Sequence, residues 1–237
     1  MACSMTGRRL FIAGAHTDVG KTHVACALIR AARAEALTVE ALKPVLSGFD
    51  VADWVQSDPG RLLTALDEAP TSEALARMSP WRFAAPLAPP MAARLEARSL
   101  PLGPIVDVCR ERITASTADL LVVEGVGGLM SPLADGATGL DLMMALELPT
   151  ILVGGSYLGA ISHTLTALEV LRTRGLQVAA IIVSGSADPE SPDFGETVAL
   201  VAEFAGWTPV IAAPRGKPHL WPQQMLTASC QQSSVAA

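Results

Sequence analysis

The 237-residue sequence predicts an α/β fold, a single doubly wound and mostly parallel sheet with helices on both faces. Three observations predict it. Short apolar runs of strand type alternate with Ala- and Leu-rich runs of helical type along most of the chain. Half of the residues are hydrophobic but only 4% are aromatic, so the core must be built from Ala, Val, Leu and Ile, as in parallel sheets covered by helices. A glycine-containing turn joins the first strand-like run to the first helical run.

Apolar runs, helix formers and turn residues predict the elements of the N-terminal half. Residues 9–13 are an apolar strand, and residues 22–36 are a helix without Pro or Gly. Residues 38–42 form a second strand, which ends at Lys43 and Pro44. The remaining predicted elements of this half are a loop over 45–60, short helices over 61–67 and 72–78, an extended proline-rich loop or lid over 79–90, and helices over 91–98 and 104–116.

In the second half, residues 119–124 are the clearest strand, a buried apolar run stopped by Gly125. Residues 161–174 carry Ile and Leu at helical spacing, so this helix should bury one face. Residues 223–237 are polar and small and predict a frayed tail. Because neither a repeat nor a linker divides the chain, we expect one domain over residues 1–237. The other predicted elements are helices over 140–146 and 194–205 and strands over 150–153, 178–183 and 209–213.

Charge and cysteine usage exclude several classes of function. The formal net charge is −6 and the isoelectric point is about 5.2, which argues against non-specific binding to nucleic acid or to an anionic membrane. No apolar run approaches the length of a membrane span. The four cysteines are scattered and form no Cys-x-x-Cys pair, so they suit a reducing cytoplasm better than a zinc site or a disulfide framework.

Residues 15–22 fit the phosphate-loop pattern [AG]-x-x-x-x-G-K-[ST], with Ala15 where the strict form has Gly. The loop lies between a strand and a helix, so backbone N–H groups and the helix N-terminus can together bind phosphate oxygens. Gly20 can adopt positive φ, Lys21 would reach the β- and γ-phosphates, and the Thr22 hydroxyl would bind Mg²⁺. The pattern predicts a P-loop NTPase-like site for a nucleoside triphosphate. The alternative is a turn followed by a lysine at the start of a helix.

Other polar residues follow strands, where ligands of doubly wound folds bind. Lys43 could neutralise charge on a transferring phosphoryl group, or it could be a solvated lysine at a strand end. Glu124 lies where a Walker-B acid holds Mg²⁺, although a strand-end Glu before a flexible turn is the alternative. Asp58 precedes Pro-Gly, which is ordinary turn chemistry. Asp18 could be a general base, a ribose contact or a surface carboxylate.

Taken together, the motifs resemble the dethiobiotin synthetase family. They are Gly14-x-x-Thr-x-Val-Gly-Lys-Thr22, Lys43-Pro-Val-x-Ser-Gly48, Pro80-x-x-Phe-x-x-Pro-x-Ala-Pro89, Val123-Glu-Gly-x-Gly-Gly128 and Leu158-Gly-x-Ile-x-His-Thr164. The phosphate-loop motif is shared by many ATPases, whereas the Lys-Pro and Glu-Gly motifs at this spacing are far more specific. The resemblance extends from about residue 9 to residue 185.

The resemblance implies a cytoplasmic homodimer that uses ATP, Mg²⁺ and CO₂ to close the ureido ring of dethiobiotin on diaminopelargonic acid. It implies that Lys21, Lys43 and Thr17 serve catalysis, and that Thr22, Asp58 and Glu124 hold Mg²⁺. Besides these residues, the implied nucleotide contacts are Asp18, Val19, Gly20, Gly125, Val126, Gly127, Gly185, Ala213, Pro214 and Arg215. The implied substrate contacts are Thr17 and Ser47, together with the turn of Gly159, Ala160, Ile161 and Ser162, which would face the substrate carboxylate across the dimer interface.

The sequence departs from the family pattern at a few positions. The family usually has Asn near Gly185, where it reads adenine, so other nucleoside triphosphates could also serve. Pro90 replaces a common His, Tyr157 replaces a common Lys, and Ser162 replaces a common Asn. Three other readings stay open: a partner-regulated ATPase of the partitioning type, a ligase of the same superfamily with another substrate, and a degenerate nucleotide-binding copy.

Overall fold

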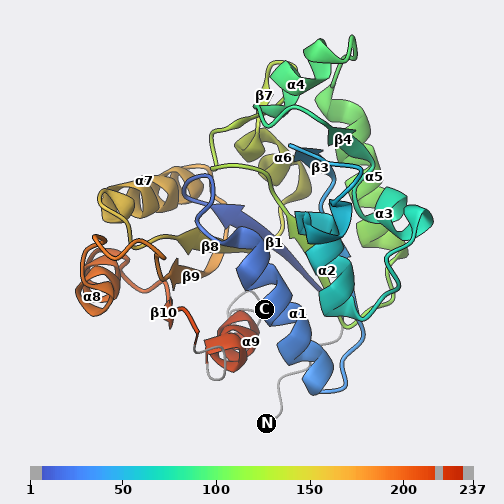
Figure 1. Cartoon of the computed structure of the whole chain (residues 1–237). Helices are drawn as coiled ribbons and strands as arrows, with labels where there is room; N and C mark the ends of the chain where they lie inside the picture. Colours follow the sequence, from blue (N-terminus) through green and yellow to red (C-terminus); the bar gives the residue numbers. More distant parts are fainter. Residues whose placement is uncertain (1–6, 217–220, 232–237) are drawn as a thin grey trace.

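The computed structural model describes residues 7–216 and 221–231. Within these residues, the central sheet consists of β1 (Arg8–Gly14), β2 (Val39–Leu42), β5 (Leu120–Glu124), β8 (Thr150–Gly154), β9 (Val178–Ser184) and β10 (Val210–Ala213). The strand order is β10-β9-β8-β1-β5-β2, and every neighbouring pair is parallel. The predicted α/β sheet is therefore confirmed. Because β1 lies in the middle of the sheet, the loop that follows it lies near the centre of the row formed by the carboxyl ends of the strands (Figure 1).

Helices cover both faces of this sheet (Figure 1). Alternate residues of β1 point to opposite faces, so Leu10 and Ile12 join one core cluster and Phe11 and Ala13 join the other. The first face is covered by α1 (Lys21–Ala34), α2 (Asp58–Leu66), α3 (Ser72–Met78) and α9 (Trp221–Gln231). The second face is covered by α4 (Pro89–Leu95), α5 (Leu102–Ala115), α6 (Gly139–Leu146), α7 (Ala160–Thr173) and α8 (Phe194–Phe204).

Two segments predicted as loops contain short strands. In these segments, β3 (Val45–Ser47) pairs in parallel with β4 (Trp81–Phe83). Elsewhere, β6 (Pro132–Ala134) pairs antiparallel with β7 (Ala137–Thr138). The predictions of a continuous loop over 45–60 and of an extended loop over 79–90 are therefore wrong in part. A strand of three residues shows no clear periodicity, and the partner of β3 lies more than thirty residues away, so pairing and burial form these strands.

Proline also misled the prediction of two helix starts. α2 begins at Asp58 instead of residue 61, and α4 begins at Pro89 instead of residue 91. Proline is tolerated in the first turn of a helix because the N–H that it lacks would have no intrahelical partner there. The 3₁₀ turn Trp54–Gln56 precedes α2, and its backbone packs closely on Gly60. The turn reading of Asp58-Pro59-Gly60 is therefore wrong.

The prediction of a frayed tail over residues 223–237 is wrong for its first part. Residues 221–231 form α9, which packs against α1, and Trp221, Met225 and Leu226 are buried there. Three apolar side chains in a Gln-rich segment are enough to dock one helical face. The rest of the predicted tail, residues 232–237, lies outside the described residues. In the described part of the chain, no helix has the length and apolar character needed to cross a membrane.

Candidate nucleotide and phosphoryl-transfer site

The connection between β1 and α1 has the geometry of a phosphate loop. Gly20 is the N-cap of α1 and has φ of 95°, a left-handed conformation that favours glycine. Asp18 also has positive φ, 59°, which Asp adopts more readily than most residues. A Cβ on Gly14 would lie 2.9 Å from the His16 carbonyl oxygen and 3.0 Å from Lys21 Cδ. Only glycine lets the loop fold back so closely over the end of its own strand.

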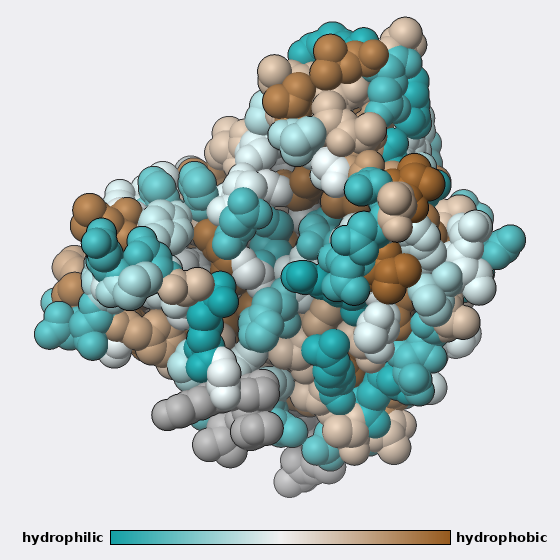
Figure 2. Space-filling model, in the orientation of Figure 1, coloured by the Kyte–Doolittle hydropathy of each residue, from teal (hydrophilic) through white to brown (hydrophobic). Residues whose placement is uncertain are grey.

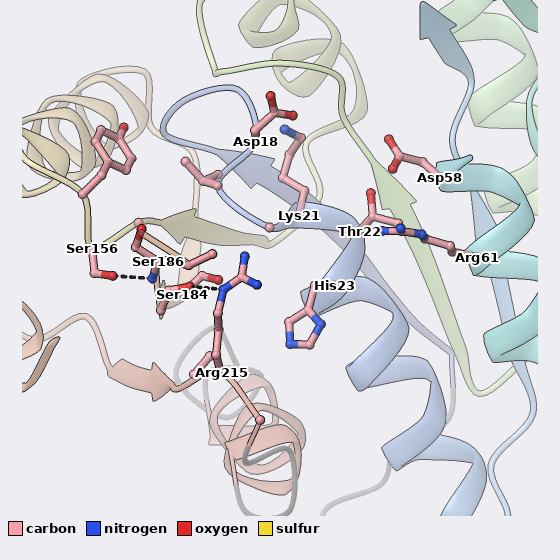
Figure 3. A pocket seen from close by; sticks show the side chains of 18 residues that line it. Asp18, Lys21, Thr22, His23, Asp58, Arg61, Ser156, Ser184, Ser186 and Arg215 are labelled. Carbon is pink, nitrogen blue, oxygen red and sulfur yellow. Dashed lines mark hydrogen bonds between the residues drawn. The ribbon is translucent and has the colours of Figure 1, made fainter. Parts of the chain in front are cut away.

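A cavity of about 510 Å³ opens at this loop. Hydrophilic side chains gather across the middle of the same face in Figure 2, and Figure 3 shows the labelled side chains converging from the loop, from α2 and from the ends of the neighbouring strands. The cavity is lined by Asp18, Val19, Gly20, Lys21, Thr22, His23, Asp58, Arg61, Gly155, Ser156, Tyr157, Ser184, Gly185, Ser186, Ala187, Ala213, Arg215 and Gly216.

Strand register brings the second lysine and the acid together. Leu42 of β2 pairs with Val123 of β5, so the next residues, Lys43 and Glu124, leave the sheet side by side. Lys43 Nζ lies 2.6 Å from Glu124 Oε1 and 2.8 Å from Asp58 Oδ2. Thr22 Oγ1 donates a hydrogen bond of 2.6 Å to the same Glu124 oxygen. Four predicted residues, from α1, α2, β5 and the connection after β2, therefore form one cluster beside the phosphate loop.

Burial and charge set the protonation of the two lysines. Burial would lower the pKa of Lys43, but the carboxylates of Glu124 and Asp58 raise it above its ordinary value. Burial together with the nearby positive charge of Lys43 lowers the pKa of Lys21 to about 8. Lys43 therefore lies close enough to Lys21 to act on it electrostatically. For Asp58, the charge and hydrogen bond of Lys43 outweigh burial and lower the pKa.

The predicted nucleotide contacts divide into those that line the cavity and those behind it. Asp18 to Thr22, Asp58, Gly185, Ala213 and Arg215 line it. Lys43 and Glu124 are each 1% exposed and reach the cavity through Thr22 and Asp58, which contact them. Gly125, Val126 and Gly127 instead line a small void between the loop and α6. Pro214 is not a lining residue, although both of its chain neighbours are.

The predicted substrate contacts lie outside this cavity, in two places. Ser47 ends β3, and the next residue, Gly48, donates a backbone hydrogen bond of 3.0 Å from its N–H to Ala85 O in the proline-rich segment. The proline-rich segment therefore packs along the Lys43–Gly48 stretch. Thr17 lies beside the glycine-rich turn after β5, because a Cβ on Gly127 would lie 3.6 Å from Thr17 Oγ1.

The second place is the N-terminus of α7, which begins at Ala160 with Gly159 as its left-handed N-cap. Ile161 and Ser162 lie in its first turn. This turn is joined to the phosphate loop by aromatic contacts: His16 stacks on His163 with 5.2 Å between ring centroids, and Tyr157 Oη lies 2.7 Å from His163 Nδ1. The turn formed by residues 159–162 therefore lies next to the phosphate loop, but none of its four residues lines the cavity.

Sequence reasoning missed several lining residues. Ser156 follows β8, so the rule that ligands bind beyond strand ends, which points to Tyr157 and Ser184 as polar residues of the same crevice, could also have found Ser156. Arg61 lies three residues after Asp58 on α2 and could be found only once the helix is known to begin at Asp58. The other missed lining residues are His23, Gly155, Ser186, Ala187 and Gly216.

The cluster offers hard oxygen donors, the ligands that Mg²⁺ prefers. Glu124 Oε2 is buried and has no hydrogen-bond partner among the described residues, so it is available to a cation or to a water molecule bound by one. No group of three His, Cys, Asp or Glu side chains that could hold a metal ion exists within 7–216 and 221–231. This donor set fits Mg²⁺ shared with nucleotide phosphates, because such an ion needs only one or two carboxylates from the protein.

Comparisons with known proteins agree with this geometry. The family model described as "AAA domain" matches residues 8–218. The ATP-dependent dethiobiotin synthetase of Phenylobacterium zucineum is 59% identical over 90% of this chain and 91% of its own, and that of Caulobacter vibrioides is 52% identical over 88% and 93%. The hydrogenase maturation factor HypB of Archaeoglobus fulgidus shares the fold, with 15% identity, a TM-score of 0.54 and coverage of 95% and 91%. The resemblance seen in the motifs is confirmed: the chain belongs to the ATP-dependent dethiobiotin synthetase family.

Proposed function

We propose that this ATP-dependent ligase closes the ureido ring of dethiobiotin on diaminopelargonic acid with the pair Lys21 and Lys43. One observation carries the assignment of roles: Lys43, Asp58, Glu124 and Thr22 form a single hydrogen-bonded cluster beside the phosphate loop. A phosphoryl group passing from ATP to an acceptor spreads negative charge over its oxygens, and fixed cations and N–H groups stabilise that charge. The names of the relatives supply the product, dethiobiotin.

The reaction proceeds in three chemical steps. One amine of the diamine attacks CO₂ and loses a proton, which gives a carbamate. A carbamate oxygen then attacks the γ-phosphorus, and ADP leaves, which gives a carbamic-phosphoric anhydride. The second amine attacks the anhydride carbonyl, and phosphate leaves as the ring closes. Lys21 binds the triphosphate, while Lys43, held in place by two carboxylates, offsets the charge of the carbamate and the γ-phosphate.

Thr22, Asp58 and Glu124 would hold Mg²⁺, whose charge neutralises the phosphate oxygens. In the described structure, the Thr22 hydroxyl and Lys43 both donate to Glu124 Oε1 and leave Oε2 without a partner. Lys43 thus holds the carboxylates of Asp58 and Glu124 close together before Mg²⁺ binds, so that both could bind the same ion. This arrangement lowers the cost of bringing like charges together at the moment of binding.

The substrate side involves two groups of residues. Thr17 and Ser47 lie next to the cluster along the chain, beside the glycine-rich turn and the proline-rich segment respectively, and could orient the diamine or its carbamate. At the N-terminus of α7, Ala160 N already donates to Tyr157 O, and the N–H groups of Ile161 and Ser162, at the positive end of the helix, would bind a carboxylate. We propose that this turn serves the active site of a partner subunit in a homodimer, since it lies outside its own cavity.

Two broader proposals accompany the reaction. Cys26 and Cys109 are free and buried, which suits a reducing cytoplasm, so we place the enzyme there. We also propose that the chain is one domain, because strands from residue 8 to residue 213 belong to the same sheet.

Purified protein given diaminopelargonic acid, bicarbonate, Mg²⁺ and ATP tests the proposal directly. We expect phosphate release that depends on the diamine, and dethiobiotin detected by mass spectrometry in equal amount. Phosphate release that is indifferent to the diamine would indicate an ATPase of the partitioning type instead. Diamine-free controls and omission of bicarbonate separate these outcomes.

A further inference from the structure

The order of the strands fixes the direction in which a nucleotide must lie. The phosphate loop follows β1, and β5 and β2, which carry Glu124 and Lys43 at their ends, lie on one side of it. β8, β9 and β10 lie on the other side. A nucleoside triphosphate whose γ-phosphate meets Lys43 therefore extends its base toward the ends of β9 and β10. The cavity continues in that direction, lined by Ser184 to Ala187, Ala213, Arg215 and Gly216.

Arg215 carries the positive charge among the described residues that line this end of the cavity. Its Nε donates a hydrogen bond of 3.1 Å to the Gly185 carbonyl oxygen, which holds the guanidinium in place. Figure 3 shows the guanidinium pointing into the cavity, between Ser184 on one side and His23 on the other. Since Nε is already used, the remaining N–H groups on Nη1 and Nη2 are the ones that face the cavity.

The neighbouring backbone leaves no room for a side chain at residue 185. A Cβ on Gly185 would lie 3.1 Å from Arg215 N and 3.6 Å from Pro214 Cα, so residue 185 cannot carry an amide without moving the turn after β10. Ser184 is directed toward the phosphate loop, because its Oγ would lie 2.8 Å from a Cβ on Gly20. Among the described residues that line the base end of this cavity, Arg215 is therefore the one with a long polar side chain.

A guanidinium presents N–H donors and no acceptor. Two such donors side by side match a base edge with two adjacent acceptors, as on guanine (O6 and N7) and on cytosine (O2 and N3). Adenine instead places an amino donor beside its N7 acceptor, so one of the two bonds is lost. We propose that the Arg215 side chain reads the nucleotide base and favours guanine and cytosine relative to adenine. This inference rests on the proposed function, in that the site is taken to bind a nucleoside triphosphate.

The test measures binding of ATP, GTP and CTP with Mg²⁺ by calorimetry, in the wild-type protein and in Arg215→Met, which keeps length but has no donor. We expect the ratio of GTP to ATP affinity, or of CTP to ATP affinity, to fall at least about fivefold in Arg215→Met. The GTP and CTP arms show which base is read, and 7-deaza-GTP, which lacks N7, should lose the preference if guanine is bound through O6 and N7. Arg215→Lys, which keeps the charge but not the planar fork, should behave as Arg215→Met does.

Arg30→Met is the matched control. Arg30 lies on α1 and, like Arg215, acts electrostatically on His23, but it does not line the cavity. The base ratios should therefore stay unchanged in this variant. The inference would be overturned if the GTP-to-ATP and CTP-to-ATP affinity ratios were unchanged in Arg215→Met, including the case in which the affinity for all three nucleotides falls equally. Such a result would show that the guanidinium only stacks on the base or only attracts phosphate. Failure of the diamine assay with every nucleotide, with these ratios intact, would instead overturn the proposed reaction and leave the reading of the base standing.

Discussion

The two ends of the nucleotide cavity are built in different ways. At the phosphoryl-transfer end, Lys43 and Glu124 are each 1% exposed, and parallel strand register places them in contact. At the base end, Arg215 is exposed and is held by one hydrogen bond to a backbone oxygen. The comparison indicates that the chemistry depends on buried charges that cannot move independently, whereas the choice of base depends on a surface turn that can change at little cost to the fold.

The largest expected effect is at the buried end. Lys43→Met removes the cation that two carboxylates share and leaves Glu124 buried without its partner. We expect turnover to fall by about a hundredfold or more while nucleotide binding survives, and the free energy of unfolding to fall by about 3–5 kcal/mol. Phosphate release and thermal unfolding measure the two effects. Arg33→Met breaks the exposed Arg33–Asp67 ion pair and should cost no more than about 1 kcal/mol. Unchanged turnover in Lys43→Met would remove Lys43 from the mechanism.

Glu124→Gln tests the metal assignment at the same end. The amide keeps the size of the side chain and can still accept from Thr22, but it loses the negative charge. We expect the Mg²⁺ concentration for half-maximal activity to rise by about 10–100-fold, with smaller losses at saturating Mg²⁺. Glu96→Gln, which removes an exposed carboxylate beside Arg98, serves as the control. An unaltered Mg²⁺ requirement would show that Glu124 supports Lys43 only.

The pH dependence of nucleotide affinity should come from Lys21. Its pKa is about 8 in the free protein because of burial and Lys43, and bound phosphate would raise it. Below pH 8 the ammonium is already present, and above pH 8 binding must take up a proton, so affinity should fall by up to about tenfold per pH unit. Lys43 has a raised pKa and stays charged throughout. Calorimetry at pH 7 and pH 9 in two buffers measures the proton uptake. If Lys21→Met shows the same dependence, another group is responsible.

The smallest expected effect is at the base end. Ser156 Oγ accepts a hydrogen bond of 2.7 Å from Ser186 N and so fixes the turn after β9. Ser156→Ala should weaken nucleotide binding about fivefold, the value of one hydrogen bond of about 1 kcal/mol, and leave the rate at saturation unchanged. Ser116→Ala removes a comparable bond to Ala118 N near the start of β5, far from the cavity, and should leave the affinity unaltered. A lower rate at saturating nucleotide in Ser156→Ala would show that the base end of the cavity also affects phosphoryl transfer at the other end.

Much of the fold was predictable because its signals are local. The buried runs at β5 and β8, the glycine-containing loop before α1 and the Ala-rich helix α1 all appear within windows of ten to fifteen residues. The elements that escaped prediction depend on distant partners. β3 exists because it pairs with β4, and α9 exists because Met225 and Leu226 dock on α1. Neither segment has a periodicity long enough to be recognised alone.

The residues of the site also divide into those that local sequence predicted and those that only distant contacts bring in. Residue types and spacing alone predicted the phosphate loop and its lysine, because a loop that wraps phosphate needs a fixed order of glycine, lysine and hydroxyl. The buried apolar run before Glu124 predicted that this acid ends a strand. Only the tertiary structure decided that Asp58 begins a helix and meets Lys43, and that Arg215 turns its guanidinium over Gly185 into the cavity. Those contacts join elements far apart in the chain, and strand order and register create them. A sequence states which groups are available, whereas packing of the sheet and its helices decides which of them meet.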